Sequence, residues 1–104
     1  MKKHLKNPWT DEGEYLAYLN MERAMYSWCL VHYGNYSDVE ALKESESFYK
    51  YQPPGEYRGL VFHDEAWHCA MLKVFGECYW KLRPDLGSPC PEYEKEADNW
   101  IRNF

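Results

Sequence analysis

The sequence lacks any long apolar segment. Charged residues interrupt its two most apolar regions, at Glu22 and Arg23 and again at Lys73 and Glu77. A membrane-spanning helix needs about 18 or more consecutive apolar residues, so no such helix is predicted. The lysines near the amino terminus are followed by neither an apolar run nor a small-residue cleavage site, so we predict no secretory signal. We therefore expect a cytoplasmic protein that does not contact membranes.

Basic residues are scarce after residue 6. Beyond Lys2, Lys3 and Lys6, the chain carries nine basic and seventeen acidic residues, a charge of −8. Nucleic-acid binding requires clustered lysine or arginine side chains that neutralise phosphates and release counterions. Because no such cluster follows residue 6, we expect no direct binding of nucleic acid and favour a basic protein as partner. Residues 1–8 are expected to form a flexible basic arm.

Phosphate-binding glycine loops are also missing, because the six glycines are isolated from one another. The four cysteines are expected to be reduced thiols, since no export signal is present. Cys69 and Cys78 fall on one predicted helix, about 13 Å apart along its axis, which is too far for a disulfide. A bridge from Cys29 to either of them stays geometrically open. No residue is predicted to be catalytic, and the sequence favours a protein that is not an enzyme.

Aromatic residues, in contrast, are abundant. Ten tyrosines, five tryptophans and four phenylalanines make up 18% of the 104 residues. A single domain of this size cannot easily hide so many large rings. We expect most of them in the core and a smaller group at the surface, where tyrosine rings can anchor a partner. A homodimer sealed by the surplus rings is one further hypothesis.

The hydrophobic periodicity predicts an all-α fold, a compact single-domain bundle that spans residues 1–104. About four helices are expected, at residues 11–33, 38–51, 64–82 and 91–103. Thr10 is the predicted N-cap of the first helix and Gly34 its predicted end. Apolar residues at three- and four-residue spacing occupy most sides of that helix, so we expect other elements to cover it.

The second and third helices have their own signals. Ser37 and Glu40 match a capping box at the start of the second helix. Its apolar stripe is expected at Val39, Leu42, Phe48 and Tyr49, with Glu40, Glu44 and Glu46 on the side that faces water. The third helix is predicted to begin after Asp64 as its N-cap and to continue to Leu82, where Pro84 stops it.

Tyrosines and carboxylates gather around the end of the second helix, in a segment (residues 37–56) of charge −3. In such a surface, charge speeds the encounter with a basic protein and the rings hold the complex. Our leading hypothesis is a non-enzymatic protein-binding module, an inhibitor or neutralising (immunity-type) protein that engages a basic partner; the inhibitory role is an analogy from size and charge. The predicted partner-binding residues are Tyr36, Glu44, Glu46, Tyr49, Tyr51, Glu56 and Tyr57.

A metal-binding helical protein or enzyme is the alternative hypothesis. Glu65 and His68 form a Glu-x-x-His pattern, which places a carboxylate and an imidazole on one helix face, as carboxylate-bridged di-iron bundles require. Such a site needs two of these patterns and two more glutamates, and this chain has one pattern. In the structural interpretation, His68 instead packs at the core margin and Glu65 caps a helix. A transition metal ion would be held by residues drawn from Glu65, His68, Glu22, His32 and His63.

Glu22 also raises a question of its own, because it interrupts an apolar row of the first helix. A buried carboxylate needs a partner, since an unpaired buried charge is costly. We expect Glu22 to pair with a tyrosine hydroxyl or an arginine. The alternative is that it forms the polar centre of a binding groove.

Overall fold

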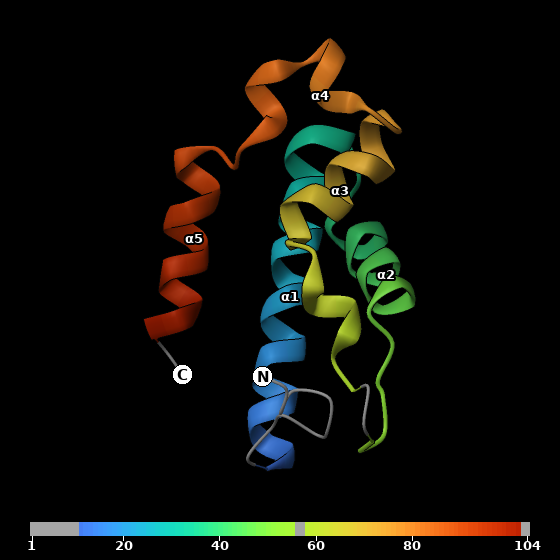
Figure 1. The fold of residues 1–104 in the computed structure, drawn as a ribbon, viewed down its shortest axis with the longest axis vertical. Coiled ribbons are helices and arrows are strands. Elements are labelled where there is room, and N and C mark those ends of the chain that lie inside the picture. Colours follow the sequence, from blue (N-terminus) through green and yellow to red (C-terminus); the bar gives the residue numbers. More distant parts are fainter. Residues whose placement is uncertain (1–10, 56–57, 103–104) are drawn as a thin grey trace.

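Helix α1 (Glu12–Gly34) runs through the middle of the molecule. The structure is a computed structural model, and it describes residues 11–55 and 58–102. Two helices, α2 (Asp38–Phe48) and α3 (Ala66–Phe75), lie to one side of α1, and α5 (Pro91–Arg102) lies on the other (Figure 1). Short helices complete the chain: η2 (Leu60–His63), α4 (Tyr79–Leu82) and η3 (Pro84–Gly87). The described residues contain no strand, which confirms the all-α bundle. The predicted basic arm, residues 1–8, lies outside the described residues.

The core is built around α1, which contacts α2, α3 and α5. Its buried side chains come from several sides of the helix, as its narrow polar strip predicts; they are Tyr15, Leu19, Met21, Glu22, Met25, Tyr26, Cys29 and Leu30. The N-cap is Asp11 and not Thr10: the Asp11 carboxylate accepts a hydrogen bond of 2.8 Å from the backbone N–H of Glu14. No described helix is both long enough and apolar enough to cross a membrane.

The end of α1 differs from the prediction at Gly34. That glycine is still helical, and the left-handed residue that ends the helix is Asn35, with φ 60°. Asparagine tolerates this conformation better than most residues, because its short side chain is polar. Gly34 is needed for another reason: a Cβ at this position would lie 2.9 Å from the Tyr36 ring and 3.1 Å from Cγ2 of Val74.

Helix α2 confirms the capping box, because both reciprocal hydrogen bonds between Ser37 and Glu40 are present. It ends at Phe48, three residues earlier than predicted. Its buried residues are Ala41 and Ser45. Of the predicted apolar stripe, Tyr49 is buried, whereas the prediction is wrong for Val39, Leu42 and Phe48, which are exposed. The small residues Ala41 and Ser45 let α2 approach α1 closely, and the Ser27 hydroxyl of α1 donates to the Ala41 carbonyl at 3.0 Å.

The predicted third helix is two helices, since α3 ends at Phe75 and α4 starts at Tyr79. Gly76 separates them with φ 92°, a conformation that side chains rarely allow, and Cys78 is left-handed with φ 59°. The N-cap position of α3 is Glu65 and not Asp64. The break turns the chain back over the core, where the Trp67 indole N–H donates to the Leu86 carbonyl at 2.8 Å.

Helix α5 packs on this core through Tyr93. The Tyr93 ring meets Trp28 of α1 and Trp67 of α3 edge-on, with centroids 5.9 and 5.2 Å apart. Ala97 and Trp100 are partly buried against the core, whereas Ile101 is 56% exposed. All four cysteines are free thiols, so neither bridge from Cys29 is formed.

Candidate functional site

The structure separates the residues of the predicted partner surface. Tyr36 follows the carboxyl end of α1, whereas Tyr51 contacts Glu12 at the amino end, and 23 helical residues span about 33 Å. Tyr49 lies in the core with no exposed surface, so its prediction as a surface anchor is wrong. Two more of the predicted residues, Glu56 and Tyr57, lie outside the described residues.

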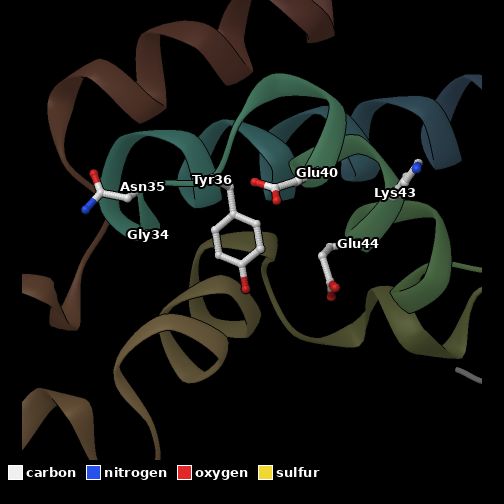
Figure 2. Close-up of a pocket in the computed structure, with 6 residues that line it drawn as sticks. All are labelled: Gly34, Asn35, Tyr36, Glu40, Lys43 and Glu44. Carbon is white, nitrogen blue, oxygen red and sulfur yellow. The ribbon is translucent and has the colours of Figure 1, made fainter.

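Tyr36 and Glu44 come together in a recess beside the α1–α2 turn (Figure 2). The recess has a volume of about 380 Å³ and is lined by Gly34, Asn35, Tyr36, Glu40, Lys43 and Glu44. Figure 2 shows the Tyr36 and Glu44 side chains projecting to the same side of the ribbon. The Tyr36 ring lies close to Gly34 and is partly buried against the core.

The outward side of α2 carries exposed apolar and acidic side chains together. Val39 is 65% exposed and Leu42 51% exposed. Asp38 and Glu46 are exposed as well, and each stands four residues from Leu42, on the same side of the helix. We call Asp38, Val39, Leu42 and Glu46 the acidic–apolar flank. The predicted stripe residues Val39 and Leu42 therefore do not form the packed face of α2. The sequence signal for that face is the small pair Ala41 and Ser45, four residues apart.

A larger hollow, the α2–α3 cleft, lies between the two helices and has a volume of about 630 Å³. It is lined by Tyr26, Glu44, Ser47, Phe48, Asp64, Cys69, Leu72, Lys73 and Glu77. The rings of Tyr26 and Phe48 stack in parallel with centroids 5.0 Å apart, and Phe48 is 43% exposed. Three lining residues are acidic, and one, Lys73, is basic. Its Nζ lies 3.3 Å from Oε1 of Glu44, so this cation is already paired.

At the other end of α1, a buried arginine binds a carboxylate and two tyrosines. Arg58 is 5% exposed, and its Nη2 donates to Oε1 of Glu12 at 2.7 Å and to the Tyr51 hydroxyl at 3.3 Å. Its guanidinium carbon lies 3.6 Å from the centroid of the Tyr15 ring. We call Glu12, Tyr15, Tyr51 and Arg58 the Arg58 clasp. Tyr51 is half exposed, as predicted, but no signal in the sequence predicts its contact with Arg58.

The clasp also fixes the ionisation of Glu12. The Tyr51 hydroxyl donates to Oε2 of Glu12 at 2.6 Å. This hydrogen bond and the one from Arg58 lower the pKa of the Glu12 carboxyl below its usual value. The Tyr51 hydroxyl is therefore engaged within the chain, although its ring is half exposed.

Glu22 is buried, with 7% of its surface exposed, and its Oε1 has no hydrogen-bond partner among the described residues. The expected pairing with a tyrosine or an arginine is therefore not made at this atom. Burial, and then the nearby charge of Glu65, raise the pKa of the Glu22 carboxyl to about 7.

The residues of the alternative metal site do not gather at one point, although Glu65 lies near enough to Glu22 to raise its pKa. Nδ1 of His68 lies 2.8 Å from the Tyr79 hydroxyl, and Nδ1 of His32 lies 2.8 Å from the Trp28 carbonyl. His63 and Glu65 are exposed. Over residues 11–55 and 58–102, no three or more histidine, cysteine, aspartate or glutamate side chains are arranged to hold a metal ion. The arrangement therefore gives no support to the metal hypothesis.

No protein-family model matches the chain, and no curated protein or solved structure is significantly similar to it. The functional interpretation therefore depends on the surface of α2 and on the two hollows beside it.

Proposed function

We propose that this chain is a cytoplasmic protein-binding module that engages a basic protein through α2 and thereby inhibits or neutralises it. The observation that carries the proposal is the acidic–apolar flank. There, Leu42 is more than half exposed between two exposed carboxylates on the same side of the helix. Charged groups at an interface steer the partner and set specificity, whereas apolar side chains at its centre contribute affinity.

The rest of the molecule agrees with a basic partner. The chain has a net charge of −5, and the recess next to the flank is lined by Glu40 and Glu44 against one lysine, Lys43, together with the partly buried ring of Tyr36. A tyrosine at the edge of an acidic surface suits an interface, because it provides a large contact area with little loss of side-chain freedom. The free thiols are compatible with a reducing cytoplasm.

The test compares two charge reversals on different helices. Glu46→Lys alters the flank on α2, and Glu94→Lys makes the same change in net charge at an exposed position of α5. The wild-type chain is used to capture a partner from its native source. Affinities of the purified partner for the three chains are then measured by calorimetry in low and high salt.

We expect Glu46→Lys to weaken binding of the partner about tenfold or more and Glu94→Lys about twofold or less. Salt screens charges that lie more than a Debye length from the interface, so a charge within the interface affects affinity more than the net charge of the chain does. Binding by the wild-type chain should weaken in high salt, and an enzymatic partner should lose activity when saturated. Equal losses for both variants, an acidic partner, or binding that is insensitive to salt would contradict the proposal. Self-association in sedimentation experiments, abolished by Leu42→Ser, would instead assign the flank to a second copy of the chain.

A further inference from the structure

The Arg58 clasp shows how this chain holds a guanidinium group. One carboxylate, Glu12, accepts a charged hydrogen bond of 2.7 Å, and the ring of Tyr15 lies against the guanidinium plane at 3.6 Å. Arginine suits such a site better than lysine, because its planar, weakly hydrated head group can stack on a ring and pair with a carboxylate at the same time.

The α2–α3 cleft presents the same kinds of groups without an arginine. It offers the half-exposed ring of Phe48 beside Leu72, and carboxylates at Glu44, Asp64 and Glu77. Lys73 pairs with Glu44, which leaves the acidic side chains in excess by two. At about 630 Å³, the cleft falls within the usual range for a site that binds a small group or a side chain.

We infer that the α2–α3 cleft receives an arginine side chain of the basic partner. The inference rests on the proposed function and names the residue that anchors the complex. The guanidinium stacks on Phe48 and pairs with Asp64 or Glu77 at the rim, while its aliphatic stem packs on Leu72. An anion is disfavoured by the surplus of carboxylates, and a purely apolar group would leave that charge unmatched.

The experiment compares fluorescein-labelled hexa-arginine and hexa-lysine peptides, which have equal charge, by fluorescence anisotropy at low ionic strength. The wild-type chain should bind hexa-arginine more tightly than hexa-lysine. Phe48→Leu keeps an apolar side chain but removes the ring. It should weaken hexa-arginine binding about two- to fivefold, the size of an exposed cation–π contact, and reduce the preference for arginine.

Two further substitutions act on charge alone. Glu77→Gln should weaken the binding of hexa-arginine, whereas its matched control, Glu92→Gln on α5, should change it little; both positions are exposed. Lys73→Gln should have the opposite effect and tighten binding by up to about fivefold, because it removes the cation that competes for Glu44. Thermal melting of each variant verifies that the fold is kept.

Three outcomes would overturn the inference: equal affinity of the wild-type chain for the two peptides, equal losses for Glu77→Gln and Glu92→Gln, or weaker binding by Lys73→Gln. Failure of the proposed function looks different. If the captured partner is lost with Glu46→Lys but retained at full affinity by both Phe48→Leu and Glu77→Gln, the function stands and the arginine anchor is wrong. If hexa-arginine binds at the cleft but Glu46→Lys does not weaken binding of the partner, the proposed function is wrong, and only the preference of the cleft for arginine stands.

Discussion

Glu12 and Glu22 lie on the same helix, and their surroundings act on them in opposite directions. Glu12 sits in the first turn of α1, half exposed, with an arginine and a tyrosine hydroxyl as donors, and its carboxyl pKa is lowered. Glu22 is buried, one of its oxygens has no hydrogen-bond partner within residues 11–55 and 58–102, and its pKa is raised to about 7. The difference shows that burial and access to hydrogen-bond donors, not position on the same helix, determine how each carboxylate affects stability.

The two carboxyl groups should therefore give opposite pH dependences. The pKa of Glu22 is higher in the folded chain than in the unfolded chain, so the folded state holds its proton longer, and stability falls as the pH rises from about 4.5 to about 7. The pKa of Glu12 is lower in the folded chain. Its contribution is complete above the unfolded pKa, and it is lost as the pH falls through the folded value.

The largest expected effect comes from Glu22→Gln, which makes the buried group permanently neutral. A carboxyl pKa raised from 4.5 to about 7 corresponds to about 3 kcal/mol once the group is ionised. The free energy of unfolding of the variant, relative to the wild type, should rise by about 2 to 3 kcal/mol between pH 5 and pH 8. Urea denaturation at both pH values measures it, and a difference that does not change with pH would show that Glu22 titrates normally.

A smaller loss is expected for Tyr15→Phe, which keeps the ring beneath Arg58 but removes its hydroxyl. That hydroxyl accepts a hydrogen bond of 2.9 Å from the Gln52 backbone N–H, and its removal should cost about 1 kcal/mol, because the amide is left unsatisfied. Urea denaturation gives the value. Tyr15→Leu, which also removes the stacked ring, should be less stable still; equal stability of the two variants would mean that the ring contributes nothing to the clasp.

The smallest effect is expected for Glu12→Gln, since the Glu12 side chain is half exposed and solvent weakens its ion pair. The variant should melt below the wild type at pH 7. The gap should narrow as the pH falls through the lowered pKa of the wild-type carboxyl, because that group then becomes protonated. A gap that is unchanged in acid would show that the loss comes from packing and not from charge.

Local signals predicted the starts of two helices correctly. The Ser37–Glu40 capping box starts α2, and the helix predicted to begin at residue 91 is α5. Where prediction failed, the decisive factor was tertiary. Gly76 could have continued a helix, and its φ of 92° is favoured by the return of the chain toward Leu86.

The candidate site was predicted in part. Tyr36 and Glu44 line one recess together, as their placement around an acidic segment suggested. Arg58 could not be assigned from sequence, because it reaches Glu12 across 46 residues and no local pattern encodes so distant a contact. The exposed Leu42 was missed for a related reason: periodicity identifies apolar positions but does not show when two small residues form the packed face instead.

The three-residue connection between α1 and α2 has a consequence for how the chain assembles. Asn35 to Ser37 place two helices side by side with almost no chain between them, so their pairing requires little loop closure. Helix α5 meets the same α1 only after an excursion of more than fifty residues. Contacts close in sequence form fastest, and we expect the α1–α2 pair to be the early folding unit. Helix α5 is then the last to dock and the first to detach in native-state hydrogen exchange.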